Sequence, residues 1–383
     1  MIRRDCSIPV KPYQHSIDAR NLARCMSIRA RQSIHRCRGF KMDQSDALQQ
    51  AVRAAISRNQ TVQPGGGCTK GFLQPGAGDA VLVSTAEHSG ILQYHPDELV
   101  VRVRSGTRLV DLQATLREAG QYLPCEPPSF GAVGTVGGMV AAGLAGPSRP
   151  YVGGVRDYVL GMKLILPSGE IAAFGGDVMK NVAGYDITRL NVGARGSLGL
   201  MLEVALKVLP IPEVTQVYGL ACDAGLAQQH MLAQRRLAGL SASAYCDGAL
   251  LVRYQGSAQA QPTFEQALGQ GFQPVSSAGL AAVRNLRFAH TGHLWRWDGA
   301  VDAPVVGQMV AMDWGGALRW LASEQAPVIA ADVGVVTWFK PGNGALPALI
   351  PRADGVGRLQ QRVKSALDPK GTFVGYPALR PTP

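Results

Sequence analysis

The chain has 383 residues, and a length of this order predicts two folded domains. Hydrophobic residues make up 46% and charged residues 17%, a balance that is typical of globular proteins and excludes a disordered chain. The 46 glycines follow no Gly-X-Y period, which excludes collagen. We expect them at turns and at close approaches to a ligand.

The net charge of +11 is concentrated at the N-terminus, where residues 1–41 hold ten Lys and Arg but only two Asp. The remaining charges nearly balance, so neither a basic patch nor a nucleic-acid partner is expected. Residues 1–41 contain no apolar run, so a secretory signal peptide is not expected. A transit peptide fits their composition. We favour a disordered tail or a misassigned start, because apolar residues recur at helical spacing only after Met42.

Seven cysteines are spread along the chain without a C-x-x-C pair. This spacing excludes an iron–sulfur cluster held by the chain itself, predicts no metal site and fits a reducing, cytoplasmic compartment. Residues 127–148 carry no charge over 22 positions but include six glycines and three prolines. We therefore interpret them as a loop and a helix start rather than a membrane span.

Short strands separated by Gly-rich turns are predicted to follow an opening helix, which begins after Met42 with Asp43 or Ser45 as its cap. The other predicted elements of this half are strands at 61–63, 80–84, 99–103 and 198–208, a helix at 111–119, a hairpin of 158–166 with 171–174, and a helical turn at 187–191.

Pro210 and Pro212 mark the predicted domain boundary, because the glycine motifs stop there. Beyond them, helical and alternating patterns mix, which indicates a second α+β unit. Its predicted elements are helices at 224–240, 263–268 and 356–367, and strands at 249–254 and 333–339. The sequence thus predicts one domain at residues 42–212 and another at residues 213–383.

The first motif with chemical meaning follows a short strand and reads Gln63-Pro64-Gly65-Gly66-Gly67-Cys68-Thr69-Lys70-Gly71. Three successive glycines expose neighbouring backbone N–H groups, and such a nest, with Thr69 and Lys70 beside it, suits a pyrophosphate. The spacing matches neither a Walker loop nor a Rossmann fingerprint. The alternative is a plain flexible turn.

Two further glycine motifs follow. Gly131-x-x-Gly134-x-x-Gly137-Gly138 opens a small-residue helix at 139–144, where Thr135 can donate a hydroxyl and unpaired amides favour an anion. Tight packing against a sheet also accounts for those small residues. A second G-x-x-G-x-x-G runs from Gly193 to Gly199. Together the three motifs indicate a large ligand with several phosphates, held mainly by backbone.

In their order, these motifs resemble the FAD-binding domain of the vanillyl-alcohol oxidase and p-cresol methylhydroxylase (PCMH) family, over about residues 42–212. The resemblance implies a PCMH-type FAD-binding domain of two α/β subdomains, with FAD between them. An α+β cap domain of the FAD-linked-oxidase type would follow. The positions that the resemblance assigns to FAD are Pro64, Gly65, Gly66, Gly67, Cys68, Thr69, Lys70, Pro127, Gly134, Thr135, Gly137, Gly138, Gly143, Arg156, Gly184, Tyr185, Gly196, Leu198 and Gly199.

A closer resemblance reaches into the second half. Residues 123–128 (LPCEPP), 178–186 (VMKNVAGYD) and 313–320 (DWGGALRW) are similar to the FAD-binding (E) subunits of bacterial glycolate oxidases. That family implies a complex with a homologous flavin (D) subunit and an iron–sulfur (F) subunit. In it, glycolate is oxidised to glyoxylate and electrons pass towards quinone. It also implies a cytoplasmic location, with contact to the inner membrane made only through the complex.

The sequence departs from related flavin dehydrogenases in two places. It lacks their His-x-Gly-Asp-Gly-Asn block, so we expect substrate turnover mainly on the partner flavin subunit. Its tail follows the family's Asp-Pro-x-Gly-x-Phe pattern at residues 368–373 and then diverges. Two alternatives remain open: a scaffold subunit without redox turnover, and a free-standing FAD oxidase for another hydroxy acid.

The catalytic residues remain unassigned. Oxidation of a 2-hydroxy acid needs a base, a cation for the carboxylate and the flavin. Arg319 is a candidate for an anionic ligand or for the partner, the alternative being a cation on a helix surface. His290 and His293 have a spacing that could hold a metal from one helix face, but Thr291 and Gly292 favour a turn with surface histidines.

Three other side chains in or near the glycine motifs are candidates for a role at the flavin. Arg156 and Lys180 could offset the charge of a reduced flavin, or form surface ion pairs. A covalent flavin link through Cys68 is not expected, because the loop favours a small side chain there for steric reasons.

Overall fold

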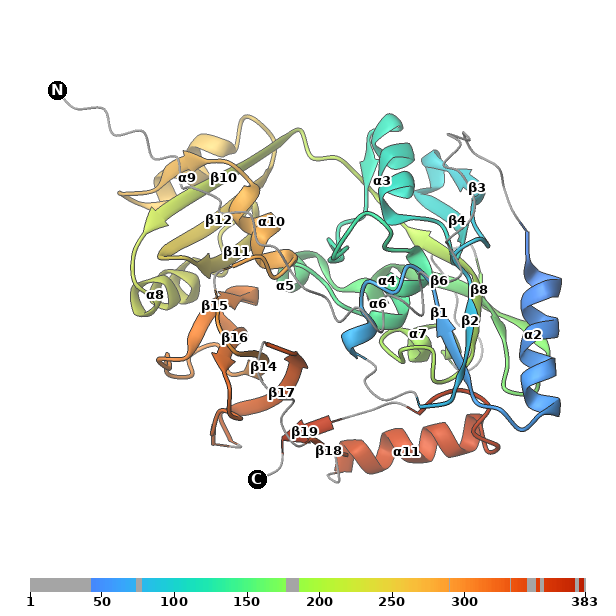
Figure 1. Ribbon diagram of the computed structural model, residues 1–383. Helices are drawn as coiled ribbons and strands as arrows, with labels where there is room; N and C mark the ends of the chain where they lie inside the picture. Colours follow the sequence, from blue (N-terminus) through green and yellow to red (C-terminus); the bar gives the residue numbers. More distant parts are fainter. Residues whose placement is uncertain are drawn as a thin grey trace. The chain divides into compact units, whose positions relative to one another are not determined.

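The computed structural model describes residues 43–73, 78–176, 186–288, 290–330, 332–342, 349–351, 355–375 and 379–381, and these belong to one compact unit. Helices and strands are mixed around two large antiparallel sheets, which confirms the predicted α+β class (Figure 1). None of the helices in these ranges is long and apolar enough to cross a membrane. The predicted tail at residues 1–41 lies outside them.

The first half is built on a five-stranded antiparallel sheet of order β3-β4-β8-β6-β7, with a separate parallel pair, β1-β2. Both faces of its central strand β8 are buried. Leu200 and Leu202 pack with α2, while Met201 and Val204 pack with α3 and α4. Strand β3 was not predicted. The elements are α2 (Ser45–Ser57), β1 (Val62–Gly65), β2 (Val81–Ser84), β3 (Ile91–His95), β4 (Val100–Arg104), α3 (Leu109–Glu118), β5 (Gln121–Tyr122), α4 (Val136–Ala142), α5 (Arg149–Val152), α6 (Val155–Tyr158), β6 (Val159–Ile165), β7 (Ile171–Gly175), α7 (Ile187–Asn191), β8 (Leu200–Lys207) and β9 (Leu209–Pro210).

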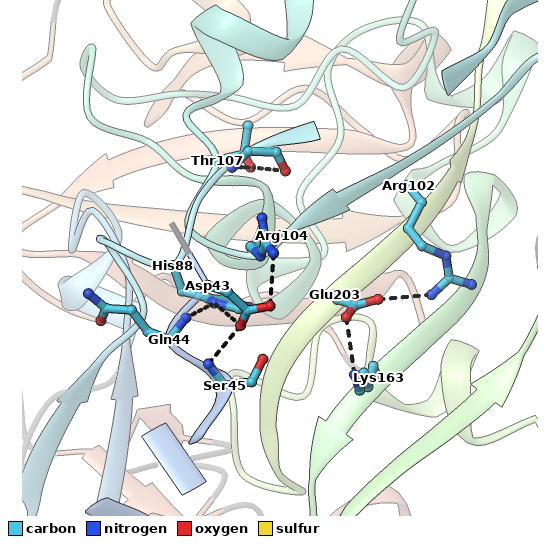
Figure 2. Close-up of polar contacts among 10 residues, drawn as sticks. Asp43, Gln44, Ser45, His88, Arg102, Arg104, Thr107, Lys163 and Glu203 are labelled. Atoms are coloured by element: carbon cyan, nitrogen blue, oxygen red, sulfur yellow. Dashed lines mark hydrogen bonds and ion pairs between the residues drawn. The ribbon is translucent and has the colours of Figure 1, made fainter. Parts of the chain in front are cut away.

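Polar contacts hold residues 43–45, where α2 begins, against this sheet (Figure 2). Asp43 accepts hydrogen bonds from Arg104 Nη2 at 2.8 Å and from the backbone N–H of Ser45 at 3.0 Å, and these contacts keep its pKa well below the usual range. The N–H of Gln44 donates to Nδ1 of the buried His88 at 3.0 Å. The N-cap of α2 is Gln44, so the prediction of Asp43 or Ser45 was wrong by one residue. Asp43 instead accepts from Ser45 N–H with one carboxylate oxygen and from the buried Arg104 of β4 with the other.

The second half is an eight-stranded antiparallel sheet of order β13-β10-β12-β11-β15-β16-β14-β17. The predicted helix at 224–240 was too long, because α8 ends at Gln234 and β11 begins at Leu240. Gly239, at φ +85°, turns the chain beneath the Tyr254 ring, so Leu240 belongs to a strand. The elements are β10 (Val214–Ala221), α8 (Ala224–Gln234), β11 (Leu240–Cys246), β12 (Ala249–Gly256), α9 (Gln261–Leu268), β13 (Gln273–Val275), α10 (Ala278–Arg284), β14 (His293–Gly299), β15 (Met309–Asp313), β16 (Leu318–Ser323), β17 (Gly334–Lys340), β18 (Leu349–Pro351), α11 (Gly355–Leu367) and β19 (Leu379–Pro381).

After α11 the chain returns to the first half. Val62 in β1 donates its N–H to the carbonyl of Thr372 at 2.7 Å, and its own carbonyl accepts from Val374 at 3.0 Å. Phe373 is 1% exposed and packs in the core that surrounds α2, with Leu48 among its members. The predicted domain boundary at residue 212 remains a prediction, but residues 372–374 clearly contact the first half.

A buried carboxylate closes the turn that makes this return possible. Asp368 is 3% exposed and accepts hydrogen bonds from the backbone N–H groups of Thr372 at 2.8 Å and Phe373 at 2.9 Å. Lys364 Nζ lies 2.5 Å from the same carboxylate and donates to the carbonyls of Ser197 at 2.7 Å and Phe373 at 2.8 Å. The Asp-Pro-x-Gly-x-Phe motif therefore ties α11 to the third glycine motif and to β1.

We expect Phe373→Ala to lower the free energy of unfolding by roughly 3–5 kcal/mol, because it leaves a cavity in a closed core. Denaturant unfolding of the full chain measures this change. Val356→Ala on the exposed face of α11 is the control, and we expect it to change stability by less than about 0.5 kcal/mol. Equal effects of the two variants would contradict the role given to the returning segment.

Candidate functional site

The first glycine loop, residues 65–70, packs backbone to backbone against the segment before α4. A Cβ on Gly67 would lie 1.7 Å from the carbonyl oxygen of Val133, and one on Gly66 would lie 2.5 Å from Thr135 Oγ1. Neither distance is compatible with a side chain. These glycines are therefore required by a close approach, and the loop is not a plain flexible turn.

The same loop presents unused hydrogen-bond donors. Within the described residues, the backbone N–H groups of Gly66, Gly67, Thr69 and Lys70 donate to no other group of the protein. Consecutive N–H groups of this kind form a concave anion site. Four unused N–H groups are compatible with the predicted pyrophosphate nest, which remains a prediction.

Lys70 adds a charge to this site. Its Nζ is buried, has no hydrogen-bond partner among the described residues and lies 5.5 Å from the centroid of the Phe130 ring. Burial lowers the pKa of this ammonium from 10.5 to about 8. A buried cation without a partner is costly, so the position suits an anionic ligand that would pair with it.

The start of α4 differs from the prediction. Unpaired amides were expected there, but Val136 donates its N–H to the carbonyl of Thr107 at 2.9 Å and Gly137 donates to that of Ser105 at 2.7 Å. Thr135 caps the helix and accepts from Gly138 N–H at 3.1 Å. The prediction was wrong because backbone carbonyls in the turn after β4 accept hydrogen bonds from these N–H groups. Gly137 instead serves packing, since a Cβ there would lie 2.8 Å from Ser105 Cβ.

The third glycine segment, residues 193–199, docks on the end of α4. Gly193 and Arg195 donate their N–H groups to the carbonyls of Val140 and Ala141 at 2.9 and 2.8 Å. A Cβ on Gly143 would lie 2.9 Å from Gly193 Cα. A Cβ on Gly196 would lie 3.0 Å from the Pro64 ring, so this segment also reaches the first loop.

The other predicted positions are more scattered. Pro127 and Leu198 are buried, and Gly199, at φ +157°, lies against the carbonyl of Ile165. Arg156 is exposed on α6. Cys68 is exposed at φ +53°. Three positions named in the sequence, Lys180, Gly184 and Tyr185, lie outside the described residues.

A pocket opens between the second glycine segment and the large sheet. Phe130 and Leu144 line it from the first half, and Asp313, Trp320 and Phe339 line it from the second. Phe72 stacks on both Phe130 and Phe339, at centroid distances of 5.7 and 5.5 Å. The walls are thus aromatic, with a single carboxyl group among these five residues.

Sequence reasoning missed Asp313. Burial raises the pKa of its carboxyl to about 8, and the charge of Glu126 acts in the same direction. The available signal was the Asp313-Trp314-Gly315-Gly316 motif, in which an acidic residue ends a strand immediately before a tight turn. In the sequence, that motif indicated only a resemblance to the E subunits of glycolate oxidases.

Strained backbone gathers around the glycine segments and the pocket. Non-glycine residues with positive φ are uncommon, cost about 1–3 kcal/mol each, and cluster at functional sites. Those near the glycine segments and the pocket are Cys68 (φ +53°), Glu126 (+44°), Phe130 (+48°), Arg195 (+54°), Leu286 (+52°) and Trp314 (+53°). Their grouping supports a functional site at this place in the fold.

The structure corrects both interpretations of Arg319. This residue lies in β16 and is 1% exposed, so it is neither a cation on a helix surface nor open to a ligand. Its guanidinium donates to the carbonyls of Ala303 at 2.6 Å and Pro304 at 3.2 Å and lies 4.4 Å from the Trp297 ring centroid. It stabilises the loop before β15.

The histidine pair is not arranged as a metal site or as a surface pair. Gly292, at φ +80°, bends the chain between the two residues, so they do not share a helix face. His293 is fully buried at the start of β14, where its Nδ1 accepts from Gly342 N–H at 3.0 Å. The surface interpretation was therefore wrong for His293. His290 is half-buried.

Known proteins resemble this chain in family, sequence and fold. Residues 40–175 match a family model described as an FAD binding domain. Over 349 residues the chain is 40% identical to glycolate oxidase subunit GlcE of Escherichia coli (strain K12), covering 86% of this chain and 96% of that protein. It is 36% identical over 123 residues to glycolate oxidase subunit GlcD of Bacillus subtilis (strain 168), covering 32% of this chain and 26% of that protein. Its fold is like that of an alkyldihydroxyacetonephosphate synthase, with a TM-score of 0.60 at 14% identity, covering 85% of this chain and 74% of that one.

We expect Gly67→Ala to weaken FAD binding by roughly 10- to 100-fold, because the clash with the Val133 carbonyl forces the loop away at a cost of about 1–3 kcal/mol. Fluorescence titration of the apoprotein with FAD measures this affinity. Gly71→Ala is a matched control, since a Cβ there meets nothing within 4 Å. Unchanged affinity of the Gly67 variant would show that the loop does not hold the cofactor.

Lys70→Met should also weaken FAD binding by roughly 10- to 100-fold, as expected when a charged hydrogen-bond partner is lost. The wild-type affinity should fall as pH rises above about 8, because the ammonium of the unliganded protein then loses its proton. Titrations between pH 7 and pH 9 test both effects. The methionine variant should lose the pH dependence, and Lys370→Met, at an exposed position, should keep it.

Proposed function

Because the chain belongs to the family of the glycolate oxidase subunit GlcE, we propose that it is the FAD-binding subunit of a heteromeric enzyme that oxidises glycolate to glyoxylate. The family is one of FAD-dependent oxidoreductases, and the cofactor of this chain is FAD. We further propose that electrons pass through this FAD to an iron–sulfur partner and then to quinone.

The observation that carries the proposal is the unpaired ammonium of Lys70 beside four unused backbone N–H groups. A diphosphate is the part of FAD that satisfies such a set of donors. Because Gly66 and Gly67 have no Cβ atom, a diphosphate can approach their backbone closely. A scaffold without cofactor has no use for a buried, unpaired cation, so this observation favours bound FAD over the scaffold alternative.

The pocket lined by Phe130 and Trp320 has a volume of about 20 Å³, which suits a water molecule and is too small for a flavin ring. When bound, FAD supplies a two-electron acceptor. The pocket walls of this chain combine aromatic and aliphatic side chains with Arg284, Arg296 and Asp313.

We propose that electrons leave this chain for another protein. The cysteines of the sequence include no C-x-x-C pair, so the usual spacing for an iron–sulfur cluster is absent. The resemblance to both GlcE and GlcD supports an assembly that contains two flavin subunits of common origin. We propose a homologous flavin subunit and an iron–sulfur subunit as its partners.

We expect the full chain, co-expressed with a homologous flavin subunit and an iron–sulfur subunit, to purify with both and to carry its own FAD. The complex should reduce a quinone analogue with glycolate, and Gly67→Ala should reduce that rate in proportion to the FAD lost from this chain. Anaerobic dye-reduction assays with a flavin determination on each subunit measure this. A complex that keeps full activity without this chain would contradict the proposal.

A further inference from the structure

Helix α11 carries an apolar stripe that is exposed to solvent. Val356, Leu359 and Leu367 are 49%, 59% and 37% exposed, and Val363 between them is half-buried. At 3.6 residues per turn, these four side chains lie within about 80° of one another on the helix. The buried residue of α11, Gly357, lies on a different side. An amphipathic helix of a globular protein normally turns its apolar stripe towards the core, so this stripe is available to a partner.

Lys364 fixes the helix from the side on which Gly357 lies. Its Nζ pairs with the buried carboxylate of Asp368 and donates to the carbonyl of Ser197 at 2.7 Å. Ser197 belongs to residues 193–199, the third glycine segment. The apolar stripe is therefore presented by a helix that is tied directly to a segment proposed to hold FAD.

The charged residues of α11 all have the same sign. The helix contains Arg358, Arg362 and Lys364 but no Asp or Glu. Lys364 is paired with Asp368, whereas Arg362 makes no ion pair within the described part of the chain. A second copy of this helix, or the basic residues 1–41, would bring like charges together, which opposes association. The surface instead fits a partner with an apolar groove and an acidic rim.

The spacing of the stripe is typical of a helix that docks in a protein groove. Residues 356, 359, 363 and 367 are separated by three or four positions, as are the anchors of helices bound in apolar grooves and of coiled-coil seams. The stripe is narrow and has no Trp or Phe. Helices that lie on a lipid surface usually have a wider apolar side with aromatic residues. These observations favour a protein over a membrane.

The size of the surface favours an electron-transfer partner. A helix of 13 residues is about 20 Å long, so α11 offers much less area than the large, apolar interfaces of permanently joined subunits. Electron-transfer partners use small interfaces, and complementary charges speed their encounter.

We propose that α11 is the docking surface for the iron–sulfur subunit, a role that rests on the proposed function. That subunit would receive Leu359 and its apolar neighbours in a groove whose rim carries Asp and Glu side chains. Docking at α11 would place the electron acceptor beside residues 193–199, and thus beside the FAD that these residues are proposed to hold.

The test is the affinity of the purified iron–sulfur subunit for the full chain loaded with FAD, measured by biolayer interferometry. Leu359→Glu places a charge in the middle of the stripe and should weaken binding by at least about 10-fold. Arg362→Glu should also weaken binding, and the wild-type affinity should fall as the salt concentration rises. Leu226→Glu, the same change at a leucine of α8 that is 42% exposed, is the matched control and should bind as wild type. All three variants should keep their FAD and their unfolding midpoint, because the replaced side chains are exposed.

Three further measurements compare Leu359→Glu with the wild-type chain. They are binding to the homologous flavin subunit, binding to vesicles that contain phosphatidylglycerol, and self-association in the analytical ultracentrifuge. We expect no difference in any of them. A selective loss in one of these three would assign the stripe to another occupant and overturn the proposal.

The proposal is equally overturned if Leu359→Glu binds the iron–sulfur subunit as tightly as the wild-type chain, or if the wild-type chain does not bind that subunit. Where the assembled complex still carries FAD on this chain and oxidises glycolate, such a result leaves the proposed function intact. A chain that binds no FAD and enters no complex would contradict the proposed function as well.

Discussion

The contact between Gly67 and the carbonyl of Val133 sets the arrangement of the site. At this point two backbone segments approach so closely that no Cβ fits between them. The contact fixes the first glycine loop relative to α4, and α4 in turn holds the third segment through its last carbonyls. Close backbone approaches therefore join the three segments.

The cost of this arrangement is concentrated at the site. Lys70 keeps an unpaired ammonium in a buried position, and Asp313 keeps a carboxyl where charge is disfavoured. Phe130 and Trp314 add strained backbone at the pocket wall. Glu203 in β8, by contrast, is paired with Arg102 and Lys163, both at 3.3 Å (Figure 2). Unpaired charged groups of this kind are expected at a site that binds an anionic ligand rich in oxygen atoms.

Local patterns in the sequence predicted much of the first half, because glycine and proline mark turns and apolar spacing distinguishes helix from strand. The hairpin around Gly169 is an example, since Ile165 and Ile171 pair as expected. What failed depended on contacts distant in the chain. The amides at the start of α4 were expected to be free, but residues 105 and 107 accept them through a register that no local pattern encodes.

The candidate site was likewise predictable from the sequence only in part. Its glycine loop was visible as a motif, whereas the burial of Arg319 and the isolation of Asp313 arise only when β15 and β16 enter a sheet of eight strands. The return of Phe373 to β1 spans more than three hundred residues, so it was likewise invisible to spacing arguments. Residue type predicted what chemistry was available, and the long-range packing decided which groups could perform it.

The central claim is that the three glycine segments of this chain hold FAD. Amide hydrogen exchange of the full chain, with and without saturating FAD, tests it most directly, because backbone N–H groups that gain an acceptor exchange more slowly. We predict that protection appears at residues 66–70 and spreads to the segments at 134–143 and 193–199. FAD binding that protects other parts of the chain and leaves residues 66–70 unchanged would contradict the account.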